Sequence, residues 1–270
     1  MVNMGNIWDR TTEFLSDNLG AVVPIALLTI FVPQSISGAI KLAGTAVTPG
    51  LGQGIVLVLL LPMLWGQLAI TALALRPDAG RAAAQSTATR RFLQSLLAML
   101  VLFAVALLVS LPMVYAWVTG GVDVPALMGA NPRSTSSGAV QFIRLYGVVW
   151  IVFAAFLSIR FSTLLMPIIA TEGGVIAALR RSFALSNGIA WKLFGVTLLF
   201  GLVGGVASIA VTSVFGALFR FLDPSAGPFA IGSIIVAILG GLVTTAYYVL
   251  QASFMAKVYL AATTATREVM

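Results

Sequence analysis

The chain has 270 residues, of which 60% are hydrophobic and only 9% are charged. Such a composition would expose too much apolar surface in water, so it excludes an ordinary soluble domain and predicts a membrane protein. The chain contains no cysteine and no histidine, which excludes disulfides, thiol nucleophiles, imidazole bases, haem and iron–sulfur ligation and the usual zinc sites. The formal charge of +7 comes from Lys and Arg residues beside apolar runs, a position that anionic headgroups explain better than nucleic acid.

Six apolar stretches are long enough to cross a bilayer as helices, and they predict an all-α, polytopic membrane protein. The predicted spans are approximately residues 19–40, 54–75, 92–118, 140–169, 191–219 and 229–262. Three shorter stretches mix apolar and charged residues at helical spacing, which predicts interfacial amphipathic helices at about 4–18, 78–91 and 172–187. We expect residues 1–270 to form a single integral membrane domain.

The N-terminal stretch places Ile7, Trp8 and Phe14 at roughly helical spacing. Its charges are mixed, with Arg10 beside several acidic residues, whereas a cleaved signal peptide begins with a basic region. We therefore expect an interfacial helix followed by an uncleaved first span.

The order of these elements suggests a repeat. An amphipathic or basic helical stretch is followed by two spans three times, over residues 4–75, 78–169 and 172–262. Each copy would enter the membrane from the same side, so the three helical hairpins would be parallel repeats rather than the inverted repeats of many transporters.

Basic residues between the spans and near their ends predict the orientation. The side of the N-terminus carries ten of them, namely Arg10, Arg76, Arg81, Arg90, Arg91, Arg180, Arg181, Lys192, Lys257 and Arg267. The other side carries four, namely Lys41, Arg133, Arg144 and Arg220. This bias predicts that both termini are cytoplasmic.

Arg160 is the only arginine that must lie well inside a predicted span. A guanidinium in hydrocarbon is costly, so it should face the bundle interior, a wet cavity or a nearby interface. Arg160 could therefore bind an anionic headgroup or substrate. It could equally extend to the cytoplasmic boundary, or donate to backbone carbonyls freed by Pro167.

The third amphipathic stretch carries further candidate lipid- or anion-binding residues, Arg180 and Arg181, and Lys192 begins the next span. Glu172 precedes this helix and could interact with its N-terminal dipole or pair with one of the arginines. The arginine pair could mark specific lipid binding or simple anchoring to phosphate groups.

The last two spans combine small and polar residues. Gly201 and Gly205 form a G-x-x-x-G pattern, which predicts close packing between helices. Tyr248, Gln251 and Lys257 make the second half of the last span polar, and they could line a cavity or connect spans.

The stretch that runs through Arg160-Phe161-Ser162, Pro167, Glu172-Gly173, Ala177-Ala178-Leu179-Arg180-Arg181-Ser182, Leu185, Gly188 and Trp191-Lys192-Leu193 resembles a known family. That family is the membrane domain of glycerophosphoryl diester phosphodiesterases and its bacterial relatives. The resemblance covers residues 160–193, and the six-span plan agrees with it over the chain. It implies a bacterial inner-membrane protein linked to lipid or envelope processes. The soluble phosphodiesterase domain of the name-giving proteins is not expected here, so their activity is not implied.

The sequence lacks the motifs of metalloproteases, nucleotide-binding loops and paired intramembrane aspartates, so we expect no enzyme and no cofactor. The leading hypothesis is a non-enzymatic inner-membrane protein that binds membrane phospholipid or a partner. One alternative is a transporter or flippase-like carrier for an anionic or lipidic substrate. Another is an accessory or scaffold subunit, which would bind a membrane-protein partner or a second copy of itself.

Overall fold

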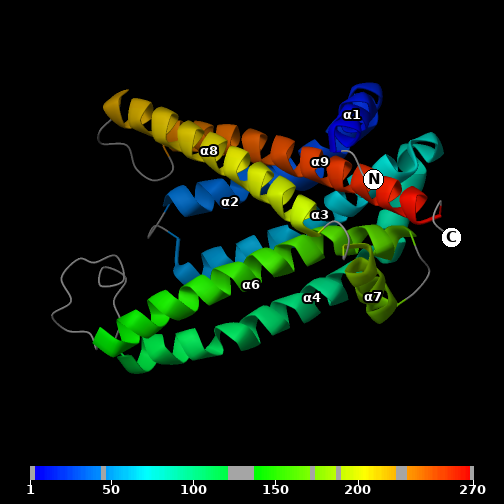
Figure 1. The fold of residues 1–270 in the computed structure, drawn as a ribbon. Helices are drawn as coiled ribbons and strands as arrows, with labels where there is room; N and C mark the ends of the chain where they lie inside the picture. The colour runs from blue at the N-terminus through cyan, green and yellow to red at the C-terminus, as the bar shows by residue number, and fades with distance from the viewer. Residues whose placement is uncertain are drawn as a thin grey trace. The chain divides into compact units, whose positions relative to one another are not determined.

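The computed structural model describes residues 4–43, 47–120, 137–170, 174–186, 190–222 and 230–267 (Figure 1). Almost all of these residues are helical, and no β-strand occurs among them. Six of the helical segments are long and apolar enough to cross a membrane. The prediction of an all-α, polytopic membrane protein is therefore confirmed.

The elements in chain order are α1 (Met4–Ala26), the π-helix η1 (Leu27–Phe31), α2 (Val32–Ala43), α3 (Pro49–Leu75), the 3-10 helix η3 (Pro77–Ala79), α4 (Gly80–Gly120), α6 (Ser137–Ala170), α7 (Val175–Ser186), α8 (Ala190–Leu222) and α9 (Ile231–Arg267). The chain divides into two compact units. The first unit comprises Met1–Ser95 and Ser162–Met270, and the second comprises Leu96–Phe161.

The first helix bends at Asn18, the last residue of the predicted interfacial helix. Asn18 has a non-helical backbone (φ −117°, ψ 16°), and its side-chain amide donates to the Phe14 carbonyl at 2.9 Å. This hydrogen bond occupies a carbonyl at the bend, where the helical ladder is interrupted. Before the bend, Ile7, Thr11 and Phe14 form a buried face at helical spacing, while Asp9, Glu13 and other charged residues are exposed.

The first span contains a π-helical turn that a proline explains. Pro33 has no N–H to donate to the Thr29 carbonyl, and its ring crowds that carbonyl. The chain widens at this point, and the N–H of Val32 bonds to the Leu27 carbonyl five residues earlier. Thr29 packs against Gly66 of α3, where even a Cβ atom would overlap the Thr29 hydroxyl. Gly66 therefore permits the close approach of the first two spans.

α9 is the central helix of the first unit, because it packs against α1, α2, α3 and α8 (Figure 1). Small residues allow the closest of these approaches. Gly241 lies against Ser35, and Ala237 lies against Gly38. Across the α8–α9 contact, Gly204 lies against the ring of Tyr247.

The predicted packing of the G-x-x-x-G pattern is not found in the described part of the chain. A Cβ atom on Gly201 or Gly205 would meet no described atom within 4 Å. The neighbouring Gly204 makes the close contact instead. The motif identifies small residues but does not predict the rotation of α8, which turns Gly204 toward the Tyr247 ring of α9.

The second amphipathic stretch is not a separate helix. The sequence predicted an interfacial helix at 78–91 and a span at 92–118, but α4 continues unbroken through both. No Gly, Pro or Asn occurs between Gly80 and Pro112, so nothing ends the helix at the expected boundary. The turn lies earlier, at η3, where Gly80 adopts φ 76°, a left-handed conformation that glycine tolerates.

The second unit is an antiparallel hairpin made by the later part of α4 and the earlier part of α6. Val140 and Ile143 are buried in it, and Met113 and Ala116 pack against them. The Tyr146 hydroxyl donates to the Val109 carbonyl across the hairpin.

Candidate functional site

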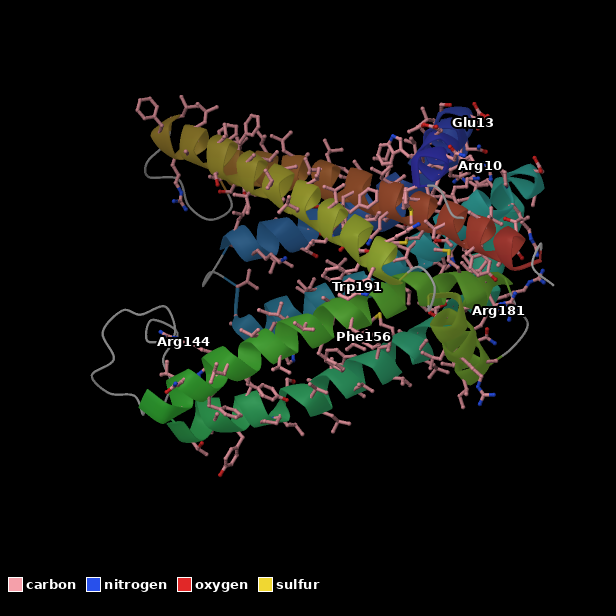
Figure 2. All side chains as sticks on the ribbon, in the orientation of Figure 1. Arg10, Glu13, Arg144, Phe156, Arg181 and Trp191 are labelled. Carbon is pink, nitrogen blue, oxygen red and sulfur yellow. The ribbon has the colours of Figure 1, made fainter. Side chains whose placement is uncertain are left out.

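The helix α7 has one buried side and carries two exposed arginines. Ala178 and Ser182, one turn apart, are buried, with about 1% of their surface exposed. Arg180 and Arg181 are exposed, and Ile176 is 76% exposed. Figure 2 shows Arg181 on α7, a short helix of the first unit.

The helical period separates α7 into three faces. At about 100° per residue, Ala178 and Ser182 define a face packed on the protein, and Val175, Ile176 and Leu179 define an apolar face. Arg180 and Arg181 flank the remaining face. This arrangement suits a helix at the membrane surface, because its apolar face can enter lipid while the arginines reach phosphate groups.

Lys192, a further candidate, lies in the first turn of α8 and is exposed. The next residue, Leu193, is almost completely buried, whereas Trp191 is 84% exposed and contacts the ring of Phe194 edge-on. Exposed Trp and Lys residues at the start of a span are typical of the interface between hydrocarbon and headgroups. Trp191 is labelled in Figure 2.

Two further residues predicted to bind lipid or an anion, Arg160 and Glu172, have no described contact with the surface of α7. Arg160 lies in α6 within the second unit, and its side chain falls outside the described residues. Glu172 also lies outside the described residues. The hypothesis that Arg160 binds an anion or lines a transport path therefore stays a prediction.

Lys257 of α9 has two partners that its sequence position did not reveal. Its ammonium donates to the Ala74 carbonyl of α3 at 3.1 Å, and its Nζ lies 4.8 Å from the centroid of the Phe14 ring. The residue therefore connects α9 with the end of α3 and with the N-terminal part of α1. The polar second half of the last span was expected either to line a cavity or to connect spans, and this contact of Lys257 connects spans.

The Ala74 carbonyl needs such a donor. Carbonyls in the last turn of a helix have no donor within the helix. α3 ends at Leu75 because Arg76 leaves the helical conformation, with φ −141° and ψ 74°, and Pro77 has no N–H. A cation at this position also interacts favourably with the negative end of the helix dipole.

The other two polar candidates of α9, Tyr248 and Gln251, are half-buried. The Tyr248 ring lies 5.4 Å from that of Tyr247, which contacts Phe200 of α8 edge-on. Phe200 in turn contacts Phe254 and Trp8. Tyr248 thus belongs to a chain of aromatic rings that joins α8, α9 and the N-terminal helix.

Sequence reasoning missed Phe14 and Ala74 as partners of Lys257. Pro77 was an available signal, because a proline shortly after an apolar span marks a helix end with free carbonyls. No sequence feature assigned the donor to a residue 183 positions later.

The fold and these surfaces define an integral membrane protein with six apolar helices that can cross a bilayer. No family model, no curated protein and no solved structure matches the chain.

Proposed function

We propose that the chain is a non-enzymatic protein of the bacterial inner membrane that binds anionic phospholipid at the cytoplasmic surface. The site is the exposed arginine pair of α7, Arg180 and Arg181, with Lys192 at the start of the next span. The proposal agrees with the resemblance of residues 160–193 to a family linked to lipid and envelope processes.

The observation that carries the proposal is the docking of α7 through Ala178 and Ser182. The helix is rotated so that these two small residues are covered while both arginines are exposed. A guanidinium can donate two parallel hydrogen bonds to a phosphate, and the exposed Ile176 gives the same helix an apolar contact with acyl chains. Anchoring and binding thus use different faces of one helix.

The expected contribution of the pair is measurable. Each basic residue near an anionic surface is worth about 1 kcal/mol, so two arginines should strengthen binding about thirtyfold. Added salt should reduce the contribution of the two arginines to lipid binding, because salt screens the interaction between exposed charges.

The test is native mass spectrometry of the purified full chain with phosphatidylglycerol and phosphatidylcholine. We expect retained phosphatidylglycerol, and a loss of roughly thirtyfold in its affinity in the Arg180→Gln/Arg181→Gln variant. Phosphatidylcholine binding should change little. A variant that binds phosphatidylglycerol as the parent does would overturn the proposal.

The matched control is Arg81→Gln/Arg90→Gln. It removes two exposed arginines on the same predicted side of the membrane but leaves α7 intact. If the control loses as much phosphatidylglycerol as the α7 variant, net charge governs binding and α7 is not the site.

A further inference from the structure

A second cationic cluster lies where α1, α3 and α9 meet, and it includes none of the α7 residues. Lys257 is half-buried there, held by the Ala74 carbonyl and the Phe14 ring. Within the described ranges, no carboxylate lies within ion-pair distance of its ammonium. A backbone carbonyl and an aromatic face stabilise the ammonium, but they carry no net negative charge to neutralise it.

A second cation stands beside Lys257. Arg10 precedes Phe14 by one helical turn, so its side chain leaves α1 next to the ring that Lys257 covers. The charges of Arg10 and Glu13 both act on Lys257 electrostatically. Figure 2 shows Arg10 and Glu13 on this part of α1. Asp9 and Asp17 also lie on this helix and are exposed, so the cluster is defined by its two cationic donors and not by a net positive charge.

We propose that Arg10 and Lys257 bind the phosphate of an anionic phospholipid headgroup. This site goes beyond the one proposed on α7 and uses none of its residues. The Arg10 guanidinium is exposed and can donate two hydrogen bonds to phosphate oxygens. Lys257 keeps donors in addition to the one bonded to Ala74, because an ammonium has three N–H groups. Both cations can donate to one phosphate, whose negative charge interacts favourably with each of them.

The position of the cluster favours a lipid as the source of the phosphate. Lys257 stands seven residues before Thr264, where the last apolar segment ends, which is about 10 Å along a helix. Trp8, two residues before Arg10, is 43% exposed, and exposed tryptophans are enriched at headgroup level. A phosphate bound there would be level with the headgroups of the surrounding bilayer.

The experiment uses the full chain in the Arg180→Gln/Arg181→Gln background, so that the α7 site does not contribute. Native mass spectrometry with phosphatidylglycerol is repeated after Arg10→Gln and, separately, Glu13→Gln. Arg10→Gln should weaken phosphatidylglycerol binding about fivefold, and Glu13→Gln should strengthen it by a similar factor. Arg10 is exposed, so its substitution should leave the fold intact even if a Lys257 variant unfolds.

The outcomes separate the two sites and the two phosphate sources. If Arg10→Gln binds phosphatidylglycerol as its parent does, this second site does not exist, whatever the α7 variant shows. Arg90→Gln, which removes an exposed arginine further along α4, should leave the affinity unchanged. If inorganic phosphate is retained in an Arg10-dependent way and phosphatidylglycerol is not, the ligand is free phosphate and the lipid proposal is overturned.

Discussion

Lys257 and Ala74 are joined by a hydrogen bond of 3.1 Å that links the last span to the end of the second. The ammonium occupies a carbonyl that the end of α3 leaves without a helical donor. The same ammonium lies over the Phe14 ring, so one side chain holds three segments of the first unit together.

This contact predicts a loss of stability in Lys257→Met. Methionine keeps an unbranched apolar side chain of similar length but can neither bond to the Ala74 carbonyl nor make a cation–π contact. We expect the free energy of unfolding to fall by about 1 to 2 kcal/mol, a modest value because the ammonium is only half-buried. Far-UV circular dichroism during unfolding in mixed detergent micelles would measure the change.

Lys192→Met is the matched control for this prediction. Lys192 is exposed, and no hydrogen bond from its ammonium to the described residues is found. Its replacement should change stability by less than about 0.5 kcal/mol. Equal losses in the two variants would show that the Ala74 contact is not stabilising.

Gly66 should be intolerant of alanine. A Cβ atom at this position would overlap the hydroxyl of Thr29 and lie 2.7 Å from its Cβ, so the first two spans would have to separate. We expect Gly66→Ala to cost about 1 to 3 kcal/mol in unfolding free energy. Gly54→Ala, in the same helix but with no atom within 4 Å of the new Cβ, should be neutral or slightly stabilising.

The neighbouring glycines of α8 should differ in the same assay. Gly204→Ala would place a Cβ 2.7 Å from the Tyr247 ring, whereas Gly205→Ala would meet nothing within 4 Å. We therefore expect a loss of about 1 to 3 kcal/mol for Gly204→Ala and little change for Gly205→Ala. Adding Tyr247→Val to Gly204→Ala should recover part of the loss. Independent, additive effects of the two substitutions would contradict the contact.

The fold class could be predicted from the sequence because the bilayer dictates it. Long apolar runs must form helices in hydrocarbon to satisfy their backbone groups, and each run is visible without tertiary information. The bend at Asn18 also coincides with the predicted end of the N-terminal helix. The continuity of α4 was missed because a change from polar to apolar residues was interpreted as a boundary, although no helix-breaking residue marks one.

The contacts between helices could not be predicted because they depend on rotation and on partners distant in sequence. Gly201 and Gly205 matched a packing motif, yet Gly204 makes the contact with α9. The exposure of Arg180 and Arg181 followed from the amphipathic pattern, but the face that docks α7 consists of Ala178 and Ser182. Neither of these small residues stands out by hydrophobicity, so the pattern alone could not identify them.

The contact between Lys257, Ala74 and Phe14 also predicts which residues lie on the same side of the membrane. This prediction does not depend on the distribution of basic residues. The contact places the end of α3 beside the N-terminal part of α1, so Thr12 and Ala79, both exposed, should lie on one side of the membrane. Thr48 is exposed at the other end of α3, a 27-residue helix of about 40 Å, and should lie on the opposite side.

The chain contains no cysteine, so single substitutions Thr12→Cys, Ala79→Cys and Thr48→Cys can be labelled with a membrane-impermeant maleimide in spheroplasts. The distribution of basic residues predicts that only Thr48→Cys reacts before the membrane is permeabilised. If Thr12→Cys and Ala79→Cys react while Thr48→Cys is protected, the arrangement of α1 and α3 stands and the inferred orientation is reversed. If Thr12→Cys and Ala79→Cys differ from each other, the contact at Lys257 cannot exist in the membrane, because one ammonium cannot bridge its two sides.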